Sequence, residues 1–311
     1  MNLDPKHPNA ELAIMGNFFS FLRLYFSVWT AILFFTSCNG HHKNYEPTFA
    51  AGSPNKKVLI FGLPNLSSYG DCDLFIKYLN KYFNKATIRV LACANADDYL
   101  DKLKKRAFDF TIINGSLVLD AEKNGYVIVG KMGDDEKYRA VIFARKDSAI
   151  NKFSDLEGKT LTTSGPNALA GTMMPLFFLY KNGVDVKKAI KRLYAPSFES
   201  TIMNVYLGRC SAGASKRGIA IDMLEHRPEI GSKLIIKWET PSLINNALFI
   251  RNDMDTLVAR ELTKLIFTLQ DSEEGKKALV PLDVSKFEKA TSETYKPLRE
   301  FLAEYNAVMN R

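Results

Sequence analysis

Polar side chains that precede two predicted helices are the strongest candidates for contact with a small ligand. Ser164-Gly165-Pro166-Asn167 comes before a helical pattern at 171–181, and Ser197-Phe198-Glu199-Ser200-Thr201 comes before another at 202–207. The first backbone N–H groups of a helix have no partner within it and carry partial positive charge, so they suit an anion. Ser, Asn and Thr are also ordinary helix caps, and the sequence leaves both interpretations open.

Two loops nearer the amino terminus carry similar side chains. Ser67-Ser68-Tyr69 follows a predicted strand at 58–61, and Asn114-Gly115-Ser116 follows one at 108–113. Ligands of open α/β sheets lie beyond the carboxyl ends of the strands, so both loops are well placed for binding. Turn formation alone would also explain these residue types.

Motifs for catalysis and for cofactors are missing from the sequence. It contains no Gly-rich phosphate loop, no G-x-S-x-G nucleophile turn and no H-E-x-x-H zinc helix. His226 is expected at a helix end, as a surface partner of the helix dipole. The pair His41-His42 in a linker is weak evidence for a metal. We therefore predict neither an enzyme nor a cofactor or metal site.

The amino-terminal region resembles an export signal. Residues 1–14 are polar and unpatterned, which favours Met15 as the true start and a non-native or mis-annotated segment before it. Residues 15–37 combine Arg23, an apolar run and small residues, as in a signal peptide. Phe35-Thr36-Ser37-Cys38 resembles the lipobox of bacterial lipoproteins, with Phe35 where leucine is preferred, which predicts a lipid such as palmitate on Cys38. A permanent membrane anchor with an unmodified cysteine is the alternative.

Composition and cysteine usage limit the remaining possibilities. The 311 residues are 46% apolar and 24% charged, which is enough for a large globular core, and the net charge is +8. Basic runs fall in amphipathic helical patterns, so we expect a solvated surface, with a patch for anionic lipid or an acidic ligand as the alternative and no nucleic-acid partner. Buried free thiols are expected at Cys72, Cys93 and Cys210, with one disulfide as the alternative.

Short apolar strands alternate with helical patterns after a flexible tether at 38–56. This alternation, at 58–113 and again at 159–238, is typical of βαβ units. Strand-like segments at 138–145 and 246–251 flank the second series and can connect two lobes. We predict an α/β protein with two lobes, each a mainly parallel sheet flanked by helices. Residues 57–142 and 244–311 would form the first lobe, and residues 143–243 the second.

Six segments between residues 57 and 306 carry a family resemblance through their order. They are Phe110-Thr-Ile-Ile-Asn-Gly-Ser116, Tyr138-Arg-Ala-Val-Ile-Phe-Ala-Arg-Lys-Asp-Ser148, Asp155-Leu-Glu-Gly-Lys-Thr-Leu161, Ser164-Gly-Pro through Gly171 to Met174-Pro175, Pro241-Ser through Phe249-Ile-Arg-Asn-Asp253, and Asp271-Ser-Glu-Glu-Gly-Lys-Lys-Ala-Leu279. In this order they resemble the phosphate/phosphite/phosphonate-binding family of type II periplasmic binding proteins, the solute receptors of ABC importers. The resemblance implies a ligand between the lobes, held by hydroxyls and by amides at helix N-termini.

Departures from this family fall on positions that would touch the ligand. Asn167-Ala168-Leu169-Ala170 replaces a Ser-Ser-Thr-Ser run, Val118 stands where a tyrosine is common, and Phe198 stands where a histidine is common. Lys216, in Ala214-Ser215-Lys216-Arg217, replaces an acidic residue that meets an amino group. The predicted ligand-binding residues are Ser67, Ser68, Tyr69, Asn114, Ser116, Val118, Asn167, Ala168, Leu169, Ala170, Ser197, Phe198, Thr201, Ser215 and Lys216.

These exchanges remove hydrogen-bond donors, so they favour a small anion or organic acid over a typical phosphonate. We predict a monomeric, extracytoplasmic or periplasmic lipoprotein that delivers this ligand to an ABC permease. One alternative is a ligand-sensing accessory protein for a membrane signalling partner. Another is a carrier of an apolar or lipid ligand, suggested by the apolar residues Leu169, Met173, Met174, Phe177 and Phe178.

Overall fold

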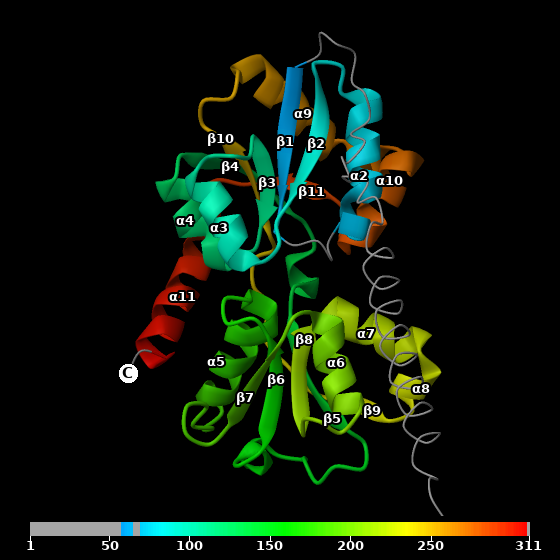
Figure 1. Ribbon diagram of the computed structural model, residues 1–311, viewed down its shortest axis with the longest axis vertical. Helices are drawn as coiled ribbons and strands as arrows, with labels where there is room; N and C mark the ends of the chain where they lie inside the picture. The colour runs from blue at the N-terminus through cyan, green and yellow to red at the C-terminus, as the bar shows by residue number, and fades with distance from the viewer. Residues whose placement is uncertain (1–56, 65–68, 310–311) are drawn as a thin grey trace, which may run out of the picture. The chain divides into compact units, whose positions relative to one another are not determined.

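The computed structural model of the protein describes residues 57–64 and 69–309 (Figure 1). The predicted leader, the lipidation site Cys38, the tether, and the loop residues Ser67 and Ser68 lie outside the described residues. Within the described part, the strands form two separate sheets. We call each sheet with its helices a lobe.

The first sheet has six strands in the order β11-β4-β10-β3-β1-β2. Its strands are β1 (Lys57–Leu63), β2 (Ala86–Ala92), β3 (Phe110–Ile113), β4 (Tyr126–Met132), β10 (Ala247–Arg251) and β11 (Phe287–Lys289). Strand β1 pairs in parallel with β2 and β3, whereas β10 is antiparallel to both β3 and β4.

The second sheet has five strands in the order β7-β6-β8-β5-β9. They are β5 (Ala140–Arg145), β6 (Thr160–Ser164), β7 (Lys191–Ala195), β8 (Ala212–Lys216) and β9 (Leu234–Glu239). Strand β6 is parallel to β7 and β8, but β5 is antiparallel to β8 and β9. Both sheets are therefore mixed, not mainly parallel as predicted, because the strands that follow each crossing between the lobes, β5 and β10, run against their neighbours.

Helices cover both faces of each sheet (Figure 1). The helices of the first lobe are α2 (Tyr69–Tyr82), α3 (Ala96–Lys104), α4 (Val118–Lys123), α9 (Thr256–Phe267), α10 (Glu273–Leu279) and α11 (Lys296–Met309), and those of the second are α5 (Met174–Lys181), α6 (Phe198–Tyr206), α7 (Arg217–His226) and α8 (Pro228–Gly231). Short turns of helix occur at η2 (Gly115–Leu117), η3 (Asp135–Lys137), η4 (Phe153–Leu156), η5 (Leu169–Met173, a π-turn), η6 (Leu269–Asp271), η7 (Val280–Leu282) and η8 (Glu293–Tyr295).

Helix α9 shows how the apolar pattern positions these helices. Its residues Val258, Leu262 and Ile266 recur at a spacing of four and are buried in the core with α2 and α10. Leu257, the residue before Val258, is 45% exposed. The helix begins at the cap Asp255, whose side chain accepts the N–H of Val258.

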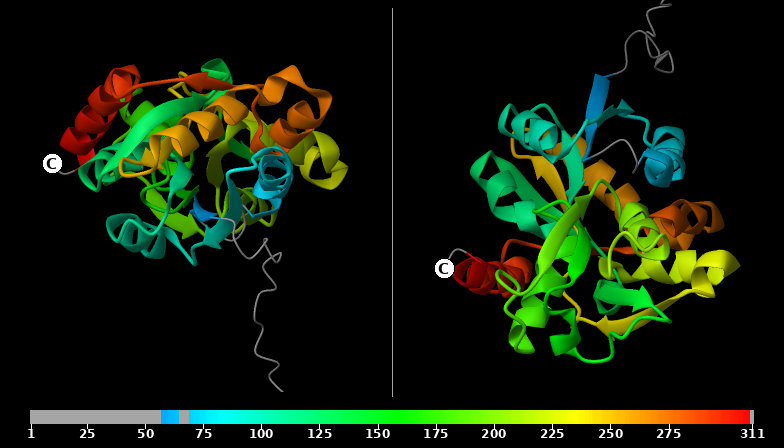
Figure 2. Two further views of the ribbon diagram at one scale, coloured as in Figure 1. Left: turned by 90° about the horizontal axis from the view of Figure 1, so that it is seen from above. Right: turned by 60° about the horizontal axis from the view of Figure 1, so that its bottom comes forward.

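Helix α11 contacts both lobes (Figures 1 and 2). Toward the first lobe, Arg299 forms an ion pair with Glu122 of α4 at 2.9 Å. Toward the second lobe, the Phe301 ring meets Phe177 of α5 edge to face, with ring centroids 5.2 Å apart. One continuous hydrophobic cluster consequently includes buried residues of α3, α4, α5 and α11.

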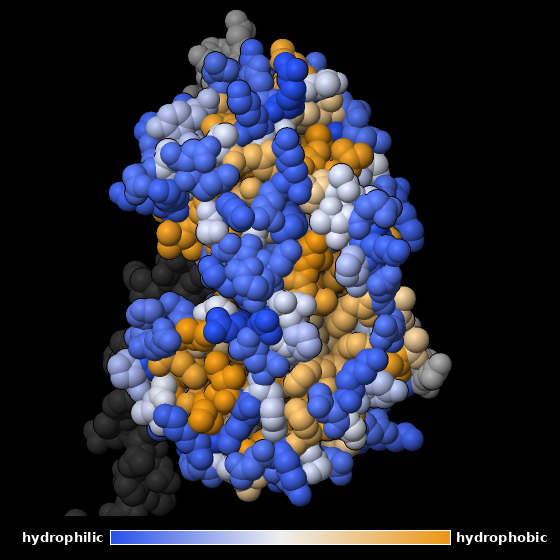
Figure 3. Space-filling model, turned by 180° about the vertical axis from the view of Figure 1, so that it is seen from behind, coloured by the Kyte–Doolittle hydropathy of each residue, from blue (hydrophilic) through white to orange (hydrophobic). Residues whose placement is uncertain are grey.

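Apolar side chains reach the surface in separate patches among polar residues (Figure 3). The most exposed large ones, Val280 and Leu207, lie on different lobes. Among the residues that the structure describes, no helix has both the length and the apolarity needed to span a bilayer.

Candidate ligand site

The carboxyl ends of the two sheets meet at a contact between two predicted ligand residues. Ser116, just after β3, donates its hydroxyl to the carbonyl oxygen of Asn167, just after β6, at 2.9 Å. Asn114 positions Ser116 by accepting its backbone N–H at 2.9 Å. The loops that follow β3 and β6 thus lie together, where a ligand between two open sheets would bind.

The helix that follows β6 begins without a side-chain cap. Its N-cap residue is Ala168, and no side chain accepts a hydrogen bond from the first turn of η5, which continues into α5. Thr172 holds the preceding loop by donating to the carbonyl oxygens of Ser164 and Gly165 at 2.5 and 3.0 Å. The capping interpretation is therefore wrong for 164–167, and the first amides of the helix keep their capacity to bind an anion.

Three buried hydroxyls near this helix start have no hydrogen-bond partner among the described residues. They belong to Thr163 and Ser164 at the end of β6 and to Ser215 near the end of β8. Thr162 pairs with Gly213, so Ser164 and Ser215, each two residues further on, share one face of adjacent strands. Unpaired buried hydroxyls are rare, and a bound anion on this face would satisfy those of Ser164 and Ser215, whereas Thr163 faces the other side of the sheet.

Ser164 lies against the first turn of the helix. A β-carbon placed on Gly171 would stand 1.7 Å from Ser164 Oγ and 2.8 Å from the ring of Phe198. Only glycine therefore allows the hydroxyl and the helix backbone to approach this closely. Phe198 is half-buried and supplies an apolar surface at the same place.

The second predicted helix start is an ordinary cap. The side chain of Ser197 accepts the backbone N–H of Ser200 at 3.1 Å, at the start of α6. Thr201 donates to the carbonyl oxygens of Phe198 and Ala214, so its hydroxyl is satisfied. The capping interpretation is correct here, and neither hydroxyl needs a ligand.

Lys216 is already paired within the protein. Its ammonium lies 3.0 Å from a carboxylate oxygen of Asp283 in the first lobe and 5.9 Å from the ring centroid of Tyr138. Burial raises the pKa of the Tyr138 hydroxyl. The lysine therefore lies at a contact between the lobes, and its charge is balanced by Asp283.

The remaining predicted residues are either buried or have side chains outside the described part of the chain. Val118 belongs to the hydrophobic core, and Leu169 and Ala170 are also buried there. A β-carbon on Gly115 would be 3.2 Å from Leu169 and closer still to Leu298, so that packing is tight. In this conformation these side chains do not line an open cavity. Tyr69 begins α2, and its side chain is outside the described part.

The residues behind the apolar-carrier alternative pack a helix against its sheet. Met173 and Met174 are buried, and Phe177 and Phe178 are half-buried against the same core. Their spacing therefore reflects core packing, and this alternative gains no support.

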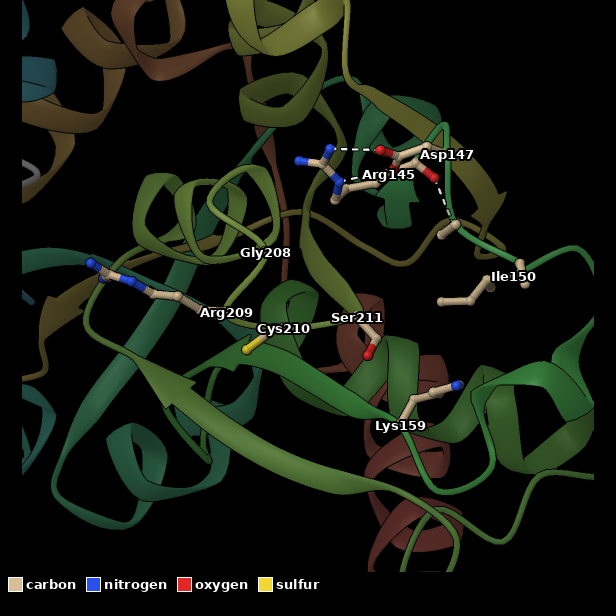
Figure 4. Close-up of a pocket in the computed structure, with 10 residues that line it drawn as sticks. Arg145, Asp147, Ile150, Lys159, Gly208, Arg209, Cys210 and Ser211 are labelled. Carbon is tan, nitrogen blue, oxygen red and sulfur yellow. Dashed lines mark hydrogen bonds and ion pairs between the residues drawn. The ribbon is translucent and has the colours of Figure 1, made fainter.

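A hollow of about 260 Å³ lies elsewhere in the second lobe (Figure 4). Its lining includes Lys159 and Ser211, which directly precede β6 and β8. The hollow therefore lies at the amino ends of these strands, opposite the candidate site at their carboxyl ends. Figure 4 shows Arg145 turned toward Asp147, with which it pairs at 2.7 Å, and Arg209 directed away from the hollow. Arg145 is therefore engaged and Arg209 is turned outward, whereas Lys159 lines the hollow.

The cysteines and histidine show no site chemistry. Cys72, Cys93 and Cys210 are buried and form no disulfide in the described part of the chain, as predicted, and burial raises the pKa of the Cys93 and Cys210 thiols. His226 lies at the end of α7, beside Asp222 at 3.0 Å. In the described ranges, no group of three or more potential ligands could hold a metal ion.

One residue of the site, Asp283, was not predicted from the sequence. Ser164 was a candidate at the helix start, but no local pattern indicated that its hydroxyl would be buried and unpaired. Asp283 is distant from Lys216 in the chain, and only the tertiary structure brings the two together.

Comparison with solved structures identifies the architecture as that of a two-lobed periplasmic binding protein. PhnD1 from Prochlorococcus marinus, solved with methylphosphonate, aligns with a TM-score of 0.72 at 22% identity, covering 80% of this chain and 98% of that one. A binding protein component of an ABC phosphonate transporter from Pseudomonas aeruginosa aligns with a TM-score of 0.73 at 19% identity, covering 82% and 88%.

Sequence comparison gives the family. The family model described as ABC transporter, phosphonate, periplasmic substrate-binding protein matches residues 71–295, and the chain belongs to this family. It is also 25% identical over 195 residues to the probable ABC transporter phosphite binding protein PhnD1 of Prochlorococcus marinus. That match covers 58% of this chain and 66% of the relative, just under two thirds of its length. The family consists of binding proteins, in agreement with the prediction that the chain is not an enzyme.

Proposed function

We propose that the protein is an extracytoplasmic receptor of an ABC importer that binds a small anion or organic acid and delivers it to a permease. The observation that carries the ligand class is the unpaired, buried hydroxyl of Ser164 at the uncapped start of the helix beginning at Leu169. A hydroxyl donor beside free helix amides provides what a carboxylate or phosphonate head requires.

A relative supports an anionic ligand of small size. PhnD1 of Prochlorococcus marinus is named as a probable phosphite binding protein and was solved with methylphosphonate, and both ligands are small anions. In this chain the run at 167–170 lacks hydroxyls, and Ser164 and Ser215 offer replacements at the strand ends. Because fewer side-chain donors surround the helix start, a head with two oxygens such as a carboxylate fits better than one with three.

The apolar part of the ligand would contact Phe198. This ring is half-buried beside Gly171, whereas Leu169 and Val118 are fully occupied by core packing. The space for a ligand body is therefore limited, which favours a short organic acid.

A thermal-shift panel with phosphate, phosphite, methylphosphonate, acetate and propionate tests the ligand class. A ligand at a hundred times its Kd adds about 2.7 kcal/mol to the free energy of unfolding, which raises Tm by several degrees. A larger shift with the carboxylates supports the proposal. A shift confined to the phosphorus oxyanions would reject an organic acid while keeping the family function, and no shift with any anion would contradict the ligand class.

The proposal includes attachment of the protein to a membrane. Lipidation at Cys38 would tether the receptor through residues 38–56, and such a tether keeps a receptor close to its permease by raising its effective concentration. The receptor would act as a monomer that closes its two lobes around the ligand by a hinge motion.

A further inference from the structure

Asp283 of the first lobe reaches the start of helix α7 in the second lobe. Its carboxylate oxygen Oδ2 lies 3.0 Å from Lys216 Nζ. The same oxygen would be 2.3 Å from a β-carbon on Gly218. Lys216 is the N-cap residue of α7 and Gly218 is its second residue, so the carboxylate lies over the first turn of the helix.

The start of α7 has the properties of a carboxylate site. The helix has ten residues and no side-chain cap. The first N–H, that of Arg217, donates to the carbonyl oxygen of Arg139 at 2.9 Å, whereas those of the next two residues have no partner within the helix. The Lys216 side chain is only 15% exposed, which strengthens its attraction for an anion. The preceding residue, Ser215, is fully buried and its hydroxyl has no partner among the described residues.

The backbone of Asp283 is held in the conformation that presents this carboxylate. Asp283 ends the turn η7 by donating its N–H to the Val280 carbonyl oxygen at 3.0 Å, and its φ is 57°. Few residues other than glycine take this left-handed conformation, and aspartate is one that tolerates it. The position of the Asp283 carboxylate is thus set by local structure in the first lobe, although its negative charge acts on the second lobe.

We propose that Lys216 and the first turn of α7 form a carboxylate site, and that the first lobe fills this site with Asp283 and so holds the ligand-free receptor closed. A solute that carries a carboxylate competes with Asp283 for the site. Asp283 thereby selects against weakly binding anions. The competition rests on the proposed function, but closure by Asp283 is independent of any ligand.

Distance measurement between spin labels tests closure without a ligand. Ala94, just beyond edge strand β2, and Arg192, on edge strand β7, are exposed and far from the crossover strands, so Ala94→Cys and Arg192→Cys carry the labels. The three described natural thiols are buried and would react slowly. In the full chain in detergent, Asp283→Asn should increase the open fraction roughly fivefold, as expected for loss of one partly buried ion pair.

Three further variants separate charge from shape. Lys216→Gln should open the lobes as much as Asp283→Asn, and the charge exchange Lys216→Asp with Asp283→Lys should close them again. Gly218→Ala should also open them, because its β-carbon displaces the carboxylate. The control is Glu273→Gln, which removes an exposed ion pair within the first lobe and should change nothing. Unchanged distances in Asp283→Asn and Lys216→Gln would overturn the proposal.

Titration with propionate tests the site itself. If Asp283 fills a carboxylate site, Asp283→Asn should bind propionate roughly tenfold more tightly than the wild type, and the added affinity should vanish in the double variant with Lys216→Gln. If the lobes open without a gain in propionate affinity, the result supports the closing contact between Asp283 and Lys216 and rejects the carboxylate site. Such a result would leave the ligand class of the importer to be decided by the thermal-shift panel.

Discussion

The hydroxyl of Ser164 and the backbone of Gly171 are in direct contact at the start of the helix that follows β6. A β-carbon on Gly171 would stand 1.7 Å from Ser164 Oγ and 3.0 Å from Ser164 Cβ. This close approach places the unpaired hydroxyl of Ser164 against the first helical turn, where an anion would bind.

Gly171→Ala should lower the free energy of unfolding by about 1–3 kcal/mol, because the new methyl group overpacks against Ser164 and Phe198. Adding Ser164→Ala should restore part of the loss, since the closest atom is the hydroxyl oxygen. Urea denaturation of the single and double variants measures this coupling.

Gly165→Ala is the matched control for this substitution. No atom lies within 4 Å of a β-carbon at Gly165, so the change should alter stability by less than about 0.5 kcal/mol. Equal effects at the two glycines would contradict the packing described here.

Ser164→Ala should stabilise the ligand-free protein and weaken anion binding. The wild-type hydroxyl is buried without a partner, and removing it should raise the free energy of unfolding by about 1 kcal/mol. The same change removes a hydrogen bond to the ligand and should raise Kd roughly tenfold. Urea denaturation and calorimetric titration measure the two effects separately.

Thr201→Val should change stability in the opposite direction to Ser164→Ala. Thr201 is also fully buried, but its hydroxyl donates to the carbonyl oxygens of Phe198 and Ala214. Its removal should therefore lower stability by about 1–3 kcal/mol. The same sign of stability change in both variants would show that Ser164 has a partner after all.

Acid should weaken an ion-pair network beside β11. Hydrogen bonds from Lys131 and Lys286 lower the pKa of the Glu288 carboxyl, and Lys131 is buried. Because the pKa of Glu288 is lower in the folded protein than its unfolded value of about 4.3, the ionised carboxylate stabilises the folded state above that pH. This stabilisation is lost as the pH falls through the folded pKa. Glu288→Gln should thus be less stable than the wild type at neutral pH, and the difference should shrink toward pH 3.

Glu304→Gln is the control for the acid series. Glu304 pairs with Lys181 at 3.1 Å, and its side chain is 59% exposed, so the pair contributes less than about 1 kcal/mol. Denaturation between pH 7 and pH 3 compares the two variants. An acid response of Glu304→Gln as large as that of Glu288→Gln would argue against the role of the buried lysine.

Cys38→Ser should release the protein from membranes. The lipobox-like segment ending at Cys38 predicts lipid on this thiol, and lipid is what would hold the chain at the membrane. Membrane fractionation of cells expressing each form measures the change. If the serine variant remains in the membrane fraction with its leader attached, the permanent-anchor alternative is favoured.

The alternation of strands and helices was predictable because each element has a clear local pattern. Predicted strands at 58–61 and 108–113 correspond to β1 and β3, and the two lobes follow from the order of the elements. Strand direction at the crossings was not predictable, because the antiparallel pairing of β5 and β10 depends on where the chain re-enters each sheet.

The candidate site was predictable only where a local motif marks it. Asn114, Ser116 and Asn167 follow strands and do meet. Val118 was misplaced at the ligand surface, since an apolar residue read from an alignment carries no sign of whether it faces a cleft or the core. The pairing of Lys216 with Asp283 joins two lobes, and no local pattern in the sequence indicates it.

The most direct test of the central claim is the response of backbone amides to anions. Propionate, acetate, methylphosphonate or phosphate would be titrated into ¹⁵N-labelled protein, and the amide resonances of Leu169, Ala170 and Gly171 followed by NMR. We predict saturable downfield shifts of these three amides, largest with a carboxylate, and saturation only at a roughly tenfold higher anion concentration in Ser164→Ala. Saturable binding with unchanged amides at these positions would contradict an anion site at this helix start.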